Sequence, residues 1–463
     1  MQRRIEHDLL GELEVPADAY WGIHTLRAIN NFPISLVPIG HYSSQVVALG
    51  QVKQAAARAN HKLGILNDEM FKAIDAACND VIAGTLNDQF VVDAIQGGAG
   101  TSTNMNANEV IANRALEKLG YAKGDYDHLH PLNHVNASQS TNDVYPTAIK
   151  VALVIDFKGL MDDLLYLCES FEAKAHEFRD VIKMGRTQLQ DAVPMTLGQE
   201  FSTYGVMIRE DIERIKNILP LISEINLGGT AIGTGLNAPE GYTELVAEYL
   251  SEITGNDFVP ATNLIEATQD TGVFITASGL LKRIAAKQSK IANDLRLLSS
   301  GPRAGFGEIN LPARQAGSSI MPGKVNPVIP EVINQIAFTV IGNDLTVTMA
   351  SEAGQLQLNA FEPIMSRSLM MSIAYLRRGC RVFADLCIDG ITANVDYLKS
   401  TVENSIGLVT ALSPKIGYEK ATAIAKHASE EGSTVRQAAM DLGYLSAKEF
   451  DAILGNVAEL TGN

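Results

Sequence analysis

One stretch of the sequence stands between two long segments of helical spacing: Gly317-Ser318-Ser319-Ile320-Met321-Pro322-Gly323-Lys324-Val325-Asn326-Pro327. It combines helix-breaking prolines and glycines with two hydroxyls, an ammonium and an amide. Glycines also let backbone N–H groups approach an anion closely. The stretch therefore predicts a flexible loop that binds a negatively charged group and helps to deprotonate it. Taken alone, such a composition is also typical of a linker.

Spacing excludes two familiar motifs at this loop. A P-loop has the form G-x-x-x-x-G-K-[ST], whereas five residues separate Gly317 from Gly323, and Val325 follows Lys324. A Ser-x-x-Lys acylase motif is also excluded, because neither serine of the stretch stands at that spacing from Lys324.

The stretch resembles the signature loop of the fumarase/aspartase superfamily, whose members eliminate a group from succinyl-type substrates and release fumarate. The resemblance extends over nearly the whole chain and is closest to the aspartase branch. It includes the segment from Gly11 onward, G-E-L-E-V-P-A-D-A-Y-W-G-I-H-T-L-R-A. It implies a mainly α fold: a long-helix bundle with smaller N- and C-terminal domains. It also implies a carbon–nitrogen lyase that reversibly deaminates L-aspartate to fumarate and ammonia.

Composition narrows the possible partners. The 463 residues are 46% hydrophobic, which is enough for a large core. The net charge of −16 argues against nucleic acid or an anionic membrane as a partner, so an anionic substrate must be held by local donors. The first residues do not resemble a signal peptide, and no apolar run is long enough to span a bilayer. The four cysteines form no C-x-x-C pair, so we expect a cytoplasmic protein with reduced thiols and no metal site.

Apolar residues recur at helical spacing over most of the chain. The predicted helical segments are 44–83, 147–180, about 196–220, 281–298, 331–351 and 361–389. No alternating strand pattern competes with them, and only 90–95 is a candidate strand. Helices of this length indicate a bundle whose apolar faces are covered by partner helices, including those of other chains.

The sequence predicts three domains: 1–141, 142–396 and 397–463. The last is expected to consist of short helices with clear start signals. Ser413-Pro414 is predicted to begin one of them, because proline suits the first helical turn. Thr434 with Gln437, and Ser446 with Glu449, have the spacing of capping boxes.

Three further polar stretches interrupt the helical pattern: 96–106, 138–143 and 185–194. The first is not a dinucleotide fingerprint, because Thr103 stands in place of the third glycine and repeated βαβ units are absent. The second has the form of a helix N-terminus, which favours anions, although ordinary capping would give the same pattern. By resemblance these stretches contribute substrate-pocket residues: Thr101, then Ser140, Thr141 and Asn142, then Thr187 and Gln188.

Deamination of L-aspartate removes a proton from carbon three and, by anti elimination, passes through an aci-carboxylate. The resemblance implies that Ser318 is the base. It assigns one substrate carboxylate, where charge develops, to Thr101, Ser140, Thr141 and Ser319, the other carboxylate to Lys324, Asn326 and Thr187, and the amino group to Asn142 and Gln188. A serine base would need loop N–H groups and Lys324 to stabilise its alkoxide, together with closure of the loop over the substrate.

Several alternatives remain open at the level of sequence. His134 and Asp143 are conventional bases, but neither stands at the matched position. Arg27 is a candidate carboxylate ligand, although a structural ion pair is the commoner role for such a residue. Fumarate hydratase is the nearest rival activity; hydratases often carry histidine where Gln188 stands, so the glutamine favours the lyase. A non-catalytic helical scaffold is a further alternative.

The resemblance also predicts how the site is assembled. It implies a homotetramer around a helical core, with each active site shared between chains. It implies no organic cofactor, and the ligand that we expect is a small dicarboxylate or amino-acid substrate.

Overall fold

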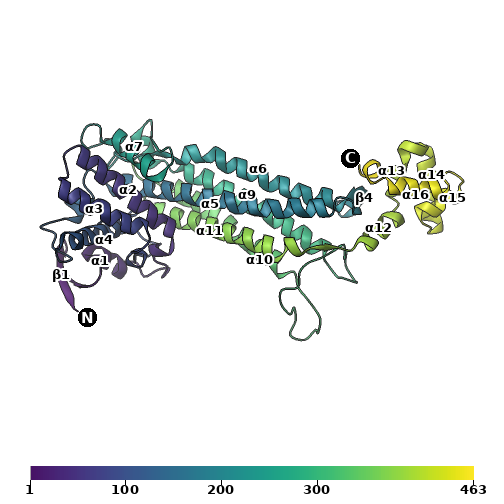
Figure 1. The fold of residues 1–463 in the computed structure, drawn as a ribbon, viewed down its shortest axis with the longest axis horizontal. Coiled ribbons are helices and arrows are strands. Elements are labelled where there is room, and N and C mark those ends of the chain that lie inside the picture. Colours follow the sequence, from purple (N-terminus) through teal and green to yellow (C-terminus); the bar gives the residue numbers. More distant parts are fainter. Residues whose placement is uncertain (1, 463) are drawn as a thin grey trace. The chain divides into compact units, whose positions relative to one another are not determined.

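The computed structural model describes residues 2–462 and shows the mainly α fold that was predicted. The long helices of the bundle are α5 (Thr141–Glu177), α6 (Leu197–Ile222), α9 (Gly272–Leu298), α10 (Val328–Glu352) and α11 (Glu362–Leu386) (Figure 1). The shorter helices are α1 (Ile23–Asn31), α2 (Ser43–Lys62), α3 (Asp68–Ile82), α4 (Thr101–Leu119), α7 (Tyr242–Thr254), α8 (Leu264–Gln269), α12 (Val395–Asn404), α13 (Leu408–Ile416), α14 (Tyr418–Glu431), α15 (Val435–Asp441), α16 (Ala447–Gly455) and α17 (Val457–Thr461). Single turns of helix occur at Ile39–His41, Asn87–Gln89, Pro131–Val135 and Ile388–Gly390.

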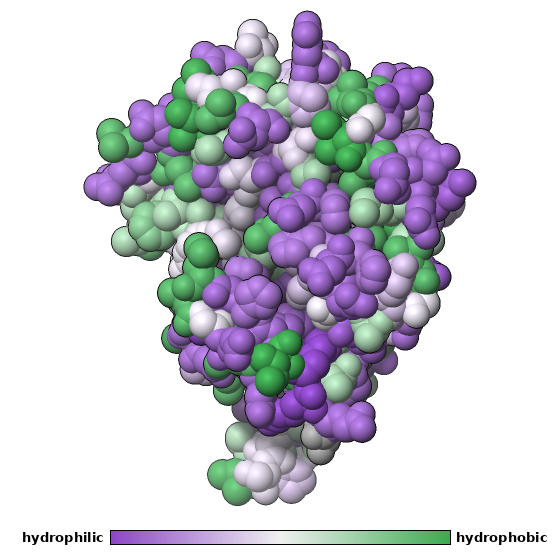
Figure 2. Space-filling model, turned by 90° about the vertical axis from the view of Figure 1, so that its left-hand side faces the viewer, coloured by the Kyte–Doolittle hydropathy of each residue, from purple (hydrophilic) through white to green (hydrophobic). Residues whose placement is uncertain are grey.

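The chain forms two compact units, each built from three separate stretches. Unit 1 contains Met1–Met161, Glu213–Arg283 and Phe338–Leu376, and unit 2 contains Asp162–Ile212, Ile284–Ala337 and Arg377–Asn463. Each of the five long helices contributes to both units. On the surface at the end of unit 1 that carries α1 to α4, hydrophilic residues are interspersed with hydrophobic ones (Figure 2). The three consecutive domains expected from sequence stay a prediction.

Aromatic packing joins the long helices inside unit 2. The ring of Phe171 on α5 lies 6.3 Å from that of Phe201 and 5.5 Å from that of Tyr204, both on α6, and 6.0 Å from that of Phe383 on α11. These rings are buried, so each removes a large apolar surface from water and fixes the spacing of the helices.

Several helix boundaries differ from those predicted, and α9, for example, begins at Gly272 rather than 281. Segment 44–83 is two helices, α2 and α3, because Gly64 adopts a φ of +77° after the first and Asn67 caps the second by accepting a hydrogen bond from Met70 N. Helix α5 begins at Thr141 rather than 147, and it contains Pro146.

Pro146 is tolerated because its missing N–H is compensated from elsewhere in the chain. A proline inside a helix leaves the carbonyl four residues earlier, here that of Asn142, without its usual donor. Asn226 Nδ2 donates to Asn142 O at 3.0 Å and satisfies it. The helix therefore starts one turn before the proline instead of after it.

The expectation of no strands beyond 90–95 is wrong. Four two-stranded sheets form: β1 (Arg3–Asp8) with β2 (Gly11–Pro16), β3 (Ile182–Thr187) with β4 (Gln190–Thr196), β5 (Glu224–Ile225) with β6 (Val259–Pro260), and β7 (Ile309–Asn310) with β8 (Thr392–Ala393). Segment 90–95 is not among them. It makes one isolated bridge, from Asp93 to Pro38, while the Asp93 carboxylate accepts backbone N–H groups of residues 34–36 and Ile95.

The terminal helices α12 to α16 share one apolar core with strand β3. Buried members of this core include Val402, Leu412, Ile424, Phe450 and, from the strand, Ile182 and Met184. The β3–β4 hairpin is therefore attached to the terminal helices on one face.

The start signals of the terminal helices are mostly correct. Ser446 and Glu449 form the predicted capping box. Thr434 accepts from Gln437 N, but the Gln437 amide donates to Asp441 instead, so only half of that box forms. The helix start predicted at Ser413-Pro414 is wrong, because Pro414 lies inside α13.

Candidate active site

The first set of candidate residues lies in unit 1, where helices α4 and α5 begin side by side. Asn104, one turn into α4, donates from Nδ2 to Thr141 Oγ1 at 3.0 Å and to Asn136 Oδ1 at 3.2 Å. Thr101, the first residue of α4, donates its hydroxyl to Gly98 O at 2.7 Å. The structure thus brings the start of α4, with Thr101, next to the start of α5, with Ser140, Thr141 and Asn142.

This approach depends on Gly100. It has a φ of +91°, and a Cβ added there would lie 2.3 Å from Cδ1 of Tyr145, a buried residue of α5. Any side chain at this position would push the two helix starts apart. We therefore explain the glycine-rich stretch 96–106 by the close approach of the backbone to helix α5, and not by nucleotide binding.

A buried lysine that the sequence did not single out supports the same cluster. Lys53 on α2 is fully buried, and its Nζ donates to Asn136 Oδ1 and to Gln139 Oε1, each at 2.9 Å. Burial lowers the pKa of Lys53 to about 7, and the charge of Asp143 opposes that change. We define the α4–α5 cluster as Lys53, Asn104, Asn136, Gln139, Thr101, Ser140, Thr141, Asn142 and Asp143.

Asp143 anchors a second segment to this cluster. Its buried carboxylate accepts N–H groups from Ser140 at 2.9 Å, Gly228 at 3.0 Å and Thr230 at 2.9 Å. Burial raises the pKa of Asp143 to about 6, against the effect of these donors. With three backbone donors on it, the carboxylate is a structural anchor, and we do not assign it the role of base.

The anchored segment, 226–237, was missed in the sequence. It also accepts a hydrogen bond at Ala231 O from Asn142 Nδ2, at 2.7 Å. Its glycines at 228, 229, 233 and 235 were the available signal, because a run of this kind marks a backbone that must follow an unusual path.

The second set of candidate residues lies in unit 2. Thr187 and Gln188 occupy the exposed tip of the β3–β4 hairpin. The two turn residues, Gln188 and Leu189, have φ values of 53° and 62°, the left-handed conformation that a two-residue turn requires. Such turns normally contain glycine or asparagine, so this hairpin stores backbone strain at a position that carries a candidate substrate contact.

The loop at 317–326 is also in unit 2 and closes on itself. Gly317 N donates to Lys324 O at 2.8 Å, and Asn326 Nδ2 donates to Gly317 O at 2.8 Å. A Cβ on Gly317 would lie 2.6 Å from Lys324 O, so only glycine fits here. The side chains of Ser319 and Lys324 are exposed.

Ser318 has one part of the environment that a serine base would need, the backbone N–H donors. Its Oγ accepts the backbone N–H groups of Ile320 at 3.2 Å and Met321 at 3.0 Å. Donors already aimed at a hydroxyl oxygen favour its ionised form over its neutral form.

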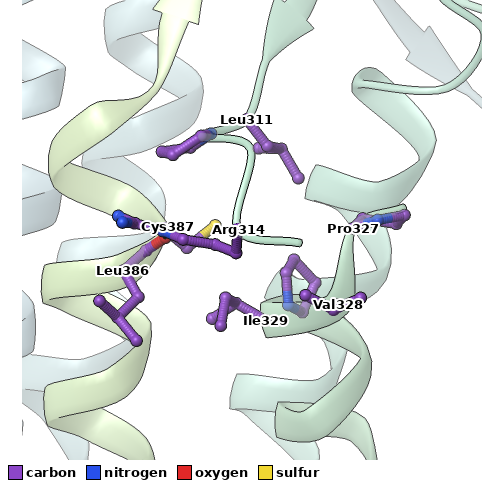
Figure 3. A pocket seen from close by; sticks show the side chains of 9 residues that line it. Leu311, Arg314, Pro327, Val328, Ile329, Leu386 and Cys387 are labelled. Atoms are coloured by element: carbon purple, nitrogen blue, oxygen red, sulfur yellow. The ribbon is translucent and has the colours of Figure 1, made fainter. Parts of the chain in front are cut away.

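The segments before and after this loop line a small pocket (Figure 3). It has a volume of about 10 Å³ and is lined by Leu311, Pro312, Arg314, Pro327, Val328, Ile329, Pro330, Leu386 and Cys387. Arg314 Nε donates to Leu386 O at 2.6 Å and so satisfies a carbonyl at the end of α11. Arg314, which precedes the loop, is thus held at the end of α11, while residues 319–325 of the loop are exposed.

Two candidates from the sequence have structural roles. Arg27 makes a bidentate ion pair with Asp8, with Nε–Oδ2 and Nη2–Oδ1 distances of 2.7 Å. This is the structural ion pair that was the alternative to a carboxylate ligand. His134 accepts the N–H of His130 at Nδ1, at 2.9 Å, and burial lowers its pKa.

The described residues contain no group of histidine, cysteine, aspartate and glutamate side chains that could hold a metal ion. Within residues 2–462, no helix combines the length and apolarity needed to cross a membrane. All four cysteines are buried and free.

Comparison with known proteins gives consistent results. The model of a family described as "Lyase" matches residues 11–342, and that of "Fumarase C C-terminus" matches residues 408–462. The chain is 60% identical to an aspartate ammonia-lyase of Pseudomonas aeruginosa over 433 residues, which cover 93% of this chain and 91% of the relative. It is 53% identical to the aspartate ammonia-lyase of Escherichia coli K12 over 451 residues, covering 97% and 94%.

Solved structures agree in fold. A cobalt-bound protein of Brucella melitensis, described as fumarate lyase:delta crystallin, superimposes with a TM-score of 0.96 at 55% identity, covering 98% of this chain and 99% of the other. A class II fumarase of Schistosoma mansoni has a TM-score of 0.91 at 35% identity, with 99% of both chains covered.

Proposed function

The chain belongs to the lyase family that includes the fumarases and aspartases, and on that premise we propose that it is an aspartate ammonia-lyase. It converts L-aspartate reversibly into fumarate and ammonia. The observation that carries the proposed mechanism is the pair of backbone N–H groups on Ser318 Oγ, in a loop that also carries Lys324.

In the proposed reaction, the alkoxide of Ser318 takes the proton from carbon three of the substrate. The electrons of that bond move onto the neighbouring carboxylate and form the aci-carboxylate, whose extra charge is held by the hydroxyls of Thr101, Ser140, Thr141 and Ser319. Collapse of this intermediate restores the carboxylate, forms the carbon–carbon double bond and expels ammonia from carbon two on the opposite side. The N–H groups of Ile320 and Met321 stabilise the alkoxide before the transfer.

The remaining candidates position the substrate. Lys324, Asn326 and Thr187 hold the second carboxylate, and Asn142 and Gln188 hold the amino group. Asn142 already has a partner, since its amide donates to Ala231 O, so its carbonyl oxygen is the atom left to accept from an ammonium group. Asn326 uses its amide to close the loop, and it would reach the substrate only as the loop rearranges.

Gln188 separates the lyase from a fumarate hydratase. A neutral amide neither accepts nor releases a proton near neutral pH, so it cannot help to activate water. It can still hydrogen-bond an amine or a carboxylate at the tip of the hairpin. The hydratase alternative is therefore not favoured.

We also propose a homotetramer whose active sites are shared between chains. Helix α10 carries an exposed apolar stripe with helical spacing, and its residues Phe338, Ile341, Leu345 and Met349 are 64%, 41%, 61% and 64% exposed. Such a stripe on a long helix is typical of a surface covered by another copy of the chain. A cytoplasmic location is part of the proposal, because the four buried cysteines remain free thiols.

One experiment tests the activity. The protein is incubated separately with L-aspartate and with L-malate, and fumarate is followed by its ultraviolet absorbance. We expect fumarate from L-aspartate and little or none from L-malate. The opposite result would identify a hydratase, and no product from either substrate would identify a scaffold.

A further inference from the structure

Glu308 is a fully buried carboxylate between helix α9 and the 317–326 loop. Two cations of strand β3 converge on it: Lys183 Nζ lies 2.8 Å from Oε2, and Arg186 Nη1 lies 2.5 Å from Oε1. Lys183 is itself only 2% exposed at its side chain. A buried charge is costly unless it is paired, so the carboxylate of Glu308 requires its cations to stay in place.

Both cations of β3 reach the same carboxylate from a strand whose pairing with β4 is irregular. Side chains of a regular strand alternate, so Lys183 and Arg186 should point to opposite faces. The pairing of β3 with β4 is irregular between these two residues, however: its register shifts between Met184 and Arg186, where β4 has one residue more than β3. Ile182 and Met184 face the apolar core of the terminal helices, while Lys183 and Arg186 both reach Glu308.

On this charged side, the hairpin is not held by close packing. A cavity of about 180 Å³ separates it from α6 and α9, and it is lined by Lys183, Arg186 and Leu189 on the hairpin, together with Glu200, Lys290, Asp294, Leu297, Leu298 and Phe306. The direction of the hairpin on this side therefore depends on ion pairs rather than on apolar contacts.

Glu308 is well suited to hold the hairpin in this direction, because its own backbone N–H and carbonyl are both hydrogen-bonded to other segments. Its N–H donates to Leu298 O at 2.9 Å, at the end of α9, and its carbonyl accepts from Asn394 N at 3.0 Å, just before α12. The Arg186 guanidinium also lies over the ring of Phe306, 4.5 Å from its centroid. Arg186 directly precedes Thr187 and Gln188.

We infer that Glu308 is a positioning residue for substrate binding: it holds β3 through Lys183 and Arg186 and thereby orients Thr187 and Gln188. The inference rests on the proposed function, which assigns those two residues to the second carboxylate and the amino group. Thr187 and Gln188 contact the substrate both in the bound complex and in the transition state. Their loss should therefore raise KM more than it lowers kcat.

The test is Glu308→Gln, which keeps the shape of the side chain and removes its charge. We expect KM for L-aspartate to rise about tenfold while kcat changes by less than about threefold, because the hairpin tip is displaced but the base is untouched. Arg186→Gln, which leaves Glu308 paired with Lys183, should give the same split, and it serves if Glu308→Gln does not fold. Glu308→Asp, which restores the charge on a shorter side chain, should recover part of the affinity.

A matched control removes the other carboxylate of Lys183. Glu200 Oε2 lies 2.6 Å from Lys183 Nζ, but it is not the carboxylate that Arg186 uses. Glu200→Gln should leave KM within about twofold of the wild-type value, because Lys183 and Arg186 both keep Glu308 as their partner. Circular dichroism and the melting temperature show which variants are folded.

The outcomes separate the inference from the proposed function. If folded Glu308→Gln and Arg186→Gln both keep the wild-type KM, or lower kcat alone, Glu308 does not act through the hairpin, while the activity of the wild type stands. If the wild type forms no fumarate from L-aspartate, the proposed function fails first and the inference fails with it.

Discussion

The start of α5 and the 317–326 loop carry most of the candidate groups, but in opposite physical states. At the start of α5, Thr141 and Asn142 are bonded to Asn104 and to Ala231 O, and a buried lysine lies in the same network. In the loop, the side chains of Ser319 and Lys324 are exposed, and the bonds of Ser318 stay within the loop itself.

Under the proposed function, this difference gives the two regions different tasks. Folding has already fixed the donors at α5, so they add little ordering cost when the substrate binds. The loop must still lose conformational freedom at that moment, which suits a lid that brings its base to the carbon only in the complex. Changes at α5 should therefore affect both stability and activity, whereas changes in the loop should affect activity alone.

The largest effect should come from Ser318→Ala. Without the base, kcat should fall by roughly 10²–10⁴, while the melting temperature stays at the wild-type value because the hydroxyl bonds only to its own loop. Steady-state assays and thermal unfolding measure the two quantities. Ser319→Ala, beside it, is the control and should lose less. Near wild-type turnover in Ser318→Ala would remove this residue from the role of base.

The next largest effect should come from Asn104→Ala, which disrupts the hydrogen-bond network at the start of α5. The change removes the donor to Thr141 Oγ1 and one of the donors to Asn136 Oδ1, so the free energy of unfolding should drop by about 1–3 kcal/mol. Because Thr141 is then free to rotate, kcat/KM for L-aspartate should fall about tenfold. Denaturant unfolding and steady-state kinetics provide the measurements.

Asn108, one turn further along α4, is the matched control. Its Nδ2 donates to Asn136 Oδ1 at 3.2 Å but not to Thr141. Asn108→Ala should cost similar stability and much less activity. Equal losses of activity in the two variants would mean that the cluster acts only through stability.

The sequence indicated the helices and the loop because both depend on local patterns. Apolar spacing located the long helices, and the Gly317–Pro327 stretch was by itself specific enough to indicate the family. Local spacing also placed Ser446 and Glu449 correctly, since a capping box is complete within four residues.

The rest depends on contacts between distant residues, which local patterns do not contain. The early start of α5 required Asn226 to satisfy the carbonyl that Pro146 leaves open. The β3–β4 hairpin was missed because its left-handed turn uses Gln188 and Leu189 in place of glycine. Lys53 and Glu308 were missed because a charged residue is expected at the surface until its buried partners are known.

A smaller effect, dependent on pH, should appear at Glu362. This residue of α11 is only 3% exposed, and burial raises its pKa to about 8, against the opposing charge of Lys150 on α5. The folded state therefore binds the proton more tightly than the unfolded chain does. That contribution to stability is complete below the unfolded pKa of about 4.5, and it is lost as the pH rises through 8.

Glu362→Gln removes this titration. At pH 9 the variant should be more stable than the wild type, by on the order of 2 kcal/mol, and the difference should shrink towards pH 5. Thermal unfolding across this range measures it, with the exposed Glu352→Gln as the control. A stability difference between variant and wild type that does not change with pH would show that Glu362 is not the titrating group.

The smallest effect should come from a helix start that has no part in the site. At the start of α16, Ser446 Oγ accepts from Glu449 N, and the Glu449 carboxylate accepts from Ser446 N at 2.8 Å, so both hydrogen bonds of the capping box form. Ser446→Ala should lower stability by about 1 kcal/mol, and Thr434→Ala, at the half-formed box, should lower it by less. Turnover should be unchanged in both variants. Since strand β3 shares its apolar core with these helices, a rise in KM for Ser446→Ala would show that the terminal helices, and not Glu308 alone, set the direction of the hairpin.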